Sequence, residues 1–251
     1  MHTFLTLLGR ELRSYFYSPI AYVVIFFFLL ASGFNFNTGI RFLNRTDAEV
    51  TVVEAAFNTV LFWFPFILIF PLITMRTYCD EFRMGTFETL TTAPVQDSHV
   101  VLAKFAGAFL FYCALWIPSF SYFAAFQWIS GKQAALAAGA YGGSYLLLAL
   151  LGMFYCSIGC LASALTTEQI NAAVMTFVAI FAAFLGGLSP FIFNITSPAS
   201  RDLISYVSAI DHMADFSRGL IDSRPVVWYL SMTSLILFIN LQVFQHRKWK
   251  A

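Results

Sequence analysis

The sequence predicts an all-α integral membrane protein with six transmembrane helices. Apolar residues make up 59% of the 251 residues and charged residues only 11%, against about 25% charged in ordinary globular proteins. The charged side chains are also clustered, so that six windows contain none. Each window has at least the ~20 residues that a helix needs to cross a hydrocarbon core. These windows are 14–40, 55–75, 105–131, 133–167, 169–200 and 225–246.

The first segment, 1–18, predicts an amphipathic helix that lies along the membrane interface. Its apolar residues recur at helical spacing, with Arg10, Glu11 and Arg13 on the opposite face. Pro19 then ends that helix or begins the next. The apolar residues are Phe4, Leu7, Leu8, Leu12 and Tyr15.

The six spans are expected at about 20–37, 55–75, 105–126, 141–163, 170–193 and 226–244. Pro65 and Pro71 predict a kink in the second span. The segment 196–224, between the last two spans, is polar but keeps an apolar stripe. It therefore predicts one or two short interfacial or re-entrant helices on the extracytoplasmic side. We expect a single transmembrane domain over 1–251.

The distribution of lysine and arginine predicts cytoplasmic termini. An even number of spans places both ends on one side, and that side carries eight of these residues while the other carries six. Positively charged residues accumulate on the cytoplasmic side of membrane proteins. The basic tail at 247–250 and the pair Arg10 and Arg13 account for most of the difference.

Several function classes are disfavoured. A net charge of +1 argues against a nucleic-acid partner. The spans hold no charged residue, and the four histidines fall at or outside their ends, which argues against a proton relay or buried haem. The chain has no phosphate-binding loop and no dinucleotide fingerprint. Cys156 and Cys160, four residues apart, have no accompanying histidine or carboxylate that would complete a metal site. We expect no enzyme activity and no cofactor on this chain.

Small residues recur every four positions at three places. Ala179, Ala183 and Gly187 in the fifth span are candidates for a subunit interface, because such faces let helices approach closely. Packing within the chain is the alternative explanation. The same spacing occurs at Ala103 and Gly107, and at Gly139 and Gly143.

The segment 76–104, RTYCDEFRMGTFETLTTAPVQDSHVVLAK, is the most informative. Gly85 interrupts the chain, Thr86 can cap a helix start, Glu88 lies in the first turn and Pro94 ends the element. Exposed apolar side chains on such a short helix predict docking into a partner's groove, with Glu81 and Glu88 at its rim. The apolar residues are Phe82, Met84, Phe87 and Leu90.

This segment resembles the first cytoplasmic loop of the permease subunits of type-2 ABC exporters. The matching positions are Glu81, Gly85-Thr86, Glu88, Leu90 and Pro94, with Lys104 entering the third span. Two further similarities are 165–172 and 216–222; the latter, with the tail at 247–249, looks most like gliding-motility-associated and nitrous-oxide-reductase-maturation permeases. The chain departs from the family pattern at Thr89 and Thr91-Thr92.

The resemblance implies a permease subunit, in the bacterial inner membrane, of an exporter driven by ATP hydrolysis on a separate ABC ATPase. It implies a second permease copy or paralogue, and it places ATP and Mg²⁺ on the partner ATPase. The implied ATPase-coupling residues are Glu81, Phe82, Gly85, Thr86, Phe87, Glu88, Leu90 and Pro94. The alternative is a non-transporting membrane scaffold that anchors an ATPase or a secretion or motility machine.

Overall fold

A computed structural model describes residues 2–43, 51–87, 95–129, 138–192 and 204–249. Every regular element within these ranges is a helix. The helices are α1 (His2–Phe16), α2 (Pro19–Leu43), α3 (Val52–Phe57), α4 (Val60–Thr74), α5 (Cys79–Met84), α7 (Asp97–Trp116), α8 (Ser119–Ile129), α9 (Ala138–Leu165), α10 (Gln169–Ile192), α12 (Ala209–Ser217) and α13 (Ser223–Lys248).

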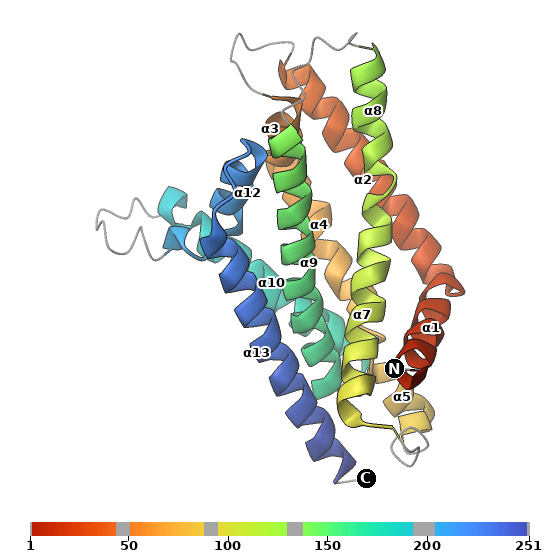
Figure 1. Cartoon of the computed structure of the whole chain (residues 1–251). Helices are drawn as coiled ribbons and strands as arrows, with labels where there is room; N and C mark the ends of the chain where they lie inside the picture. Colours follow the sequence, from red (N-terminus) through yellow and green to blue (C-terminus); the bar gives the residue numbers. More distant parts are fainter. Residues whose placement is uncertain (1, 44–50, 88–94, 130–137, 193–203, 250–251) are drawn as a thin grey trace.

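Six helical stretches in the described residues are long and apolar enough to span a bilayer, which confirms the predicted fold class. They are Pro19–Leu43, Leu61–Met84, Asp97–Phe126, Gly139–Leu165, Gln169–Ser189 and Ser223–Lys248. Figure 1 shows them as one elongated bundle with both termini and α5 at the same end, while α3 and α12 lie toward the opposite end. Pro19 begins α2, where its missing N–H costs no helical hydrogen bond.

The second and third spans are interrupted where the sequence analysis expected continuous helices. The expected second span, 55–75, is divided at Asn58, which ends α3 and donates from Nδ2 to Ser217 Oγ at 3.1 Å. α4 then continues through both Pro65 and Pro71. In the third span, Pro118 separates α7 from α8 because it cannot donate a backbone hydrogen bond. Ser119 Oγ donates instead to the carbonyl of Trp116 at 2.6 Å.

Aromatic side chains of α4, α7 and α9 form the centre of the bundle. Phe70 of α4 contacts both Tyr112 and Tyr155, with ring centroids 5.1 and 5.2 Å apart. All three side chains are buried. The spans formed by α2, α10 and α13 surround this centre, and few of their residues are buried, so that most of their apolar side chains are at least partly exposed. In a bilayer that exposure is contact with lipid, so it carries no penalty.

Two of the three small-residue motifs, Ala103 with Gly107 and Gly139 with Gly143, pack within the chain. A Cβ at Gly107 would lie 2.9 Å from Glu11 Cβ, so this glycine lets α1 press against α7. A Cβ at Gly143 would lie 2.7 Å from the carbonyl oxygen of Phe216, which shows the same closeness between α9 and α12. On α10, Ala179 and Ala183 are exposed, whereas Gly187 is buried against Ser208.

The helix α12 confirms a short helix within 196–224, although residues 196–203 lie outside the described residues. Ser208 caps it by accepting from the Asp211 amide at 3.2 Å. His212 Nδ1 lies 3.0 Å from Tyr229 Oη of α13. Burial lowers the pKa of His212, against the opposing effect of Asp215 and Asp222. This histidine is therefore held neutral more strongly than an exposed one.

Candidate functional site

The helix α5 lies at the end of the bundle that holds both termini and is hydrogen-bonded to the adjoining ends of α9 and α10. Ser163 Oγ accepts from the backbone amides of Tyr78 at 3.0 Å and Cys79 at 3.3 Å. Gln169 Nε2 donates to Asp80 Oδ1. Gly85 ends the helix with a φ of 69°, a left-handed conformation that glycine adopts without steric cost. The predicted break at Gly85 is thus confirmed.

Four charged side chains from α1, α5 and α7 meet beside α5, and we call them the charge cluster: Arg10, Glu11, Glu81 and Lys104. Glu81 Oε1 lies 2.9 Å from Lys104 Nζ and 3.0 Å from Arg10 Nη2. Glu11 Oε1 lies 2.8 Å from Arg10 Nη2 and 3.4 Å from Lys104 Nζ. Alternating charges therefore join α1 to α5 and α7, which lie more than 60 residues further along the chain.

Lys104 is the most deeply buried member of the charge cluster. Its side chain is only 2% exposed, and its ammonium also donates to the Thr77 carbonyl at 2.7 Å. A buried charge is tolerated only when it is paired and hydrogen-bonded. Burial by itself would lower the pKa of Arg10, but its hydrogen bonds and ion pairs with Glu11 and Glu81 outweigh that effect and raise the pKa. Arg10 is therefore charged at neutral pH.

A second connection, which we call the aromatic anchor, joins the residues after α5 to the last turns of α13. It consists of Phe82, Phe87 and Phe244. The rings of Phe87 and Phe244 lie 5.4 Å apart, and those of Phe87 and Phe82 lie 4.8 Å apart. Arg247 covers Phe82, with its guanidinium 4.5 Å from the ring centroid. Lys248 Nζ lies 2.8 Å from Asp97 Oδ1 at the start of α7.

These contacts correct two expectations for the segment 76–104, which we call the coupling segment because the family resemblance assigns the ATPase-coupling residues to it. Phe87 was expected to be exposed and to need a partner's groove, but it is 6% exposed because α13 supplies an apolar partner. Glu81 was expected at the rim of a partner, but its side chain is only 14% exposed and pairs within the chain. Met84, Gly85 and Thr86 are exposed. Glu88, Leu90 and Pro94 lie outside the described residues.

Three important residues of this site were not recognised from the sequence. Lys104 was identified only as the residue before the third span, and Glu11 only as part of the polar face of α1. Phe244 was treated as the end of the sixth span. One signal was available for Lys104, since a lone lysine beside a 27-residue uncharged window needs a counter-ion if its helix is buried.

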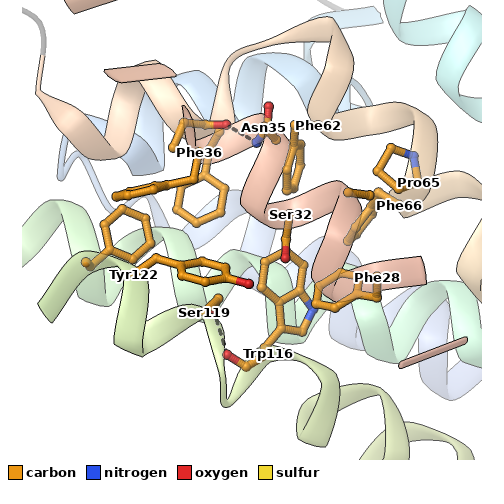
Figure 2. A pocket seen from close by; sticks show the side chains of 14 residues that line it. Phe28, Ser32, Asn35, Phe36, Phe62, Pro65, Phe66, Trp116, Ser119 and Tyr122 are labelled. Carbon is orange, nitrogen blue, oxygen red and sulfur yellow. Dashed lines mark hydrogen bonds between the residues drawn. The ribbon is translucent and has the colours of Figure 1, made fainter. Parts of the chain in front are cut away.

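A pocket at the other end of α7 is lined mainly by aromatic rings (Figure 2). It lies among α2, α3, α4, α7 and α8 and has a free volume of about 30 Å³. Ser32, Asn35 and Ser119 are its polar members, and Asn35 Nδ2 is already used in a 2.7 Å hydrogen bond to the Ala56 carbonyl. Such a volume holds one or two water molecules. In this conformation it is too small for a transported solute.

Among the described residues, no group of three or more His, Cys, Asp and Glu side chains could hold a metal ion. Cys156 and Cys160 share one face of α9 and are both completely buried. Their small apolar side chains fill space between helices.

Comparison with known families gave one match. Residues 13–188 match the sequence model of the ABC-2 family transporter proteins, from the end of α1 to α10. The match includes α5, two members of the charge cluster (Glu81 and Lys104) and five of the six spans. No match was found among curated proteins.

Proposed function

Because the chain belongs to the ABC-2 family of transporter proteins, we propose that it is the permease subunit of an ABC exporter whose ATPase docks beside α5. The chain is a multi-pass membrane protein and a membrane component of an ABC transporter. Membrane proteins of this family generally work with an ABC ATPase subunit. Docking beside α5 requires the termini to face the cytoplasm, as the lysine and arginine distribution favours.

The charge cluster is the observation that carries this proposal. A nucleotide-driven movement of the ATPase reaches the permease first at its cytoplasmic end. There α5 is joined to α1 and α7 by Arg10, Glu81 and Lys104. Displacing α5 alone would separate a 2%-exposed ammonium from its carboxylate, and breaking such a buried pair costs roughly 3–5 kcal/mol. The three helices therefore move together as one body.

The aromatic anchor extends the same linkage to the last span. Phe87 follows α5 directly and packs on Phe244 of α13. A movement of α5 and the residues that follow it is thus transmitted to the first helix, α1, through the charge cluster and to the last helix, α13, through the aromatic anchor. In this account, Met84 and Gly85 are available for the partner because they are exposed, while Phe87 holds this part of the chain in place.

ATP and Mg²⁺ bind to the partner ATPase in this proposal, and the permease itself carries no cofactor. A second permease copy or paralogue completes the complex in the bacterial inner membrane. α10 offers the contact surface, because Ala179 and Ala183 are exposed on it and small residues permit close helix approach. Gly187 is less suited to that contact, since it is buried against Ser208 of the same chain.

The test is to purify the chain with its cognate ABC ATPase and reconstitute the complex in sealed vesicles. The proposal expects ATP hydrolysis that accelerates in the presence of the permease, together with ATP-dependent movement of a solute that is lost when Lys104 is replaced. Hydrolysis and tight association without any solute movement would instead support the scaffold alternative. Absence of association with the ATPase would refute both.

A further inference from the structure

A cleft lies beside the charge cluster, between α1, the first turns of α2, and the end of α4. Its free volume is about 300 Å³, which is ten times that of the aromatic pocket and enough for a polar headgroup. The polar lining comes from α1, α5, Lys104 of α7 and the residues around Arg76, and most of the apolar lining comes from α2, α4 and α7. The apolar residues of these three helices are Ile20, Ala21, Val24, Leu72, Ile73 and Phe111, and Met84 of α5 also lines the cleft.

The position of the cleft matches the boundary between headgroups and hydrocarbon. Ser18 precedes the first span by one residue, and Arg76 follows the end of α4 by two. Both line the cleft, and they are joined by a hydrogen bond from Arg76 Nη1 to Ser18 Oγ. From this level the apolar lining runs into the membrane along Val24 and Ile73. A molecule that fills the whole cleft must therefore be polar at one end and apolar at the other.

The charges of the cleft are balanced but not all are paired. Three cations and three anions line it: Arg10, Arg76, Lys104, Glu11, Asp80 and Glu81. Arg10 and Lys104 pair with Glu11 and Glu81. Among the described residues, Arg76 forms no ion pair, and its Nε is buried without a hydrogen-bond partner. Arg76 thus offers an unused donor, and Glu81 offers an unused acceptor. The second carboxylate oxygen of Glu81, Oε2, is buried and accepts no hydrogen bond from the described residues.

We infer that this cleft binds a phospholipid with a primary amine in its headgroup, of the phosphatidylethanolamine type. Its phosphodiester pairs with the guanidinium of Arg76, its ammonium donates to Glu81, and one acyl chain lies along Val24, Ile73 and Phe111. A zwitterion preserves the three-to-three balance of charges in the lining, whereas an anionic lipid would leave one negative charge without compensation. A choline headgroup lacks the N–H donors that Glu81 Oε2 requires.

This inference is independent of the docking of an ATPase, since it concerns the permease alone in its membrane. Filling the cleft also bridges α1 to the α2 and α4 ends, so the bound lipid would hold the amphipathic helix against the bundle. The lipid thereby acts as a structural ligand of the charge cluster rather than as bulk solvent for the spans.

The experiment is retention of lipid by the purified chain, measured by native mass spectrometry after exchange into micelles that contain phosphatidylethanolamine, phosphatidylglycerol or phosphatidylcholine. We expect preferential retention of phosphatidylethanolamine. Losing a charged hydrogen bond weakens binding by about tenfold or more, so Arg76→Gln should lower retention of all three lipids by at least that factor. Glu81→Gln should reduce the preference for phosphatidylethanolamine over phosphatidylglycerol.

Arg83→Gln is the matched control, because Arg83 is an exposed arginine of α5 that does not line the cleft, and it should change nothing. Arg76→Lys, which keeps the charge, guards against a folding defect and should retain more lipid than Arg76→Gln. Equal retention of the three lipids, or equal effects of the Arg76→Gln and Arg83→Gln changes, would overturn the inference. Displacement of the lipid by millimolar glycerophosphoethanolamine would show a soluble headgroup ligand and would overturn the lipid assignment.

Discussion

Replacing Phe87 with alanine tests how the coupling segment is held. Phe87 is 6% exposed and its neighbour Phe244 is 1% exposed. Replacing either residue with alanine therefore removes an aromatic ring that is almost fully buried. Phe→Ala changes at such positions cost roughly 3–5 kcal/mol. The contact lies at one end of the bundle. We therefore expect the lost stability to favour local opening of the residues around α5, while membrane insertion is unaffected.

The pair Phe87→Ala and Phe244→Ala separates anchoring within the chain from direct contact with a partner. The two rings lie 5.4 Å apart, and such aromatic pairs couple by about 0.5–1.5 kcal/mol beyond their separate burial. Each single variant should accelerate hydrogen exchange of the amides in 78–87 and reduce co-purification of the ATPase. The double variant should cost less than the sum of both.

Phe238→Ala is the control for this pair, because Phe238 lies on the same helix with 59% exposure and should have no effect on exchange. One result would refute the reasoning. If Phe244→Ala leaves both exchange and ATPase capture unchanged while Phe87→Ala abolishes capture, then Phe87 contacts the partner itself.

Three further predictions concern the charge cluster, the subunit contact and pH. Lys104→Met should destabilise the purified protein by about 3–5 kcal/mol, measured by unfolding in mixed micelles, whereas removing the more exposed Lys248 should cost ~0.2–1 kcal/mol; equal costs would contradict the burial argument. Ala183→Leu should lower the yield of the permease dimer in mild detergent and leave insertion intact, and an unchanged dimer yield would indicate that α10 faces only lipid. Burial lowers the pKa of His212 in the folded state, so its contribution to stability is present above the unfolded value of about 6.5 and is lost as the pH falls through the folded value. The melting temperature should therefore drop between pH 7.5 and 5, and His212→Gln should reduce that drop; an identical drop in the variant would assign it to other groups.

The spans illustrate what the sequence predicts well. An uncharged window of 21 residues or more has almost no alternative to a membrane helix, so the six spans could be placed from charge alone. Gly85 and Pro19 act through their own backbone geometry, and their effects were therefore also predictable. Asn58 was not, because its interruption of the second span depends on Ser217, which lies 159 residues away.

The candidate site shows the opposite limit. Exposed aromatic residues in a short loop were reasonably assigned to a partner, since a loop has no core of its own. Phe87 finds its partner on α13, and Lys104 finds Glu11 across 93 residues. Helical periodicity describes one element at a time and contains no information on which helix end lies beside which loop. For that reason the sequence could not show which side chains fix the residues around α5 in place, and the role of this segment in ATPase coupling stays a prediction.

Site-specific crosslinking from Met84 tests the central claim most directly. Met84 is 67% exposed at the end of α5, and Leu220, at 63% exposure, lies next to α12 and serves as the control at the opposite end of the bundle. A photo-reactive amino acid is placed at either position, and the permease is illuminated in complex with its cognate ABC ATPase. The account predicts a covalent product with the ATPase from position 84 and none from position 220. A product from position 220 alone would contradict both the docking site and the proposed orientation in the membrane.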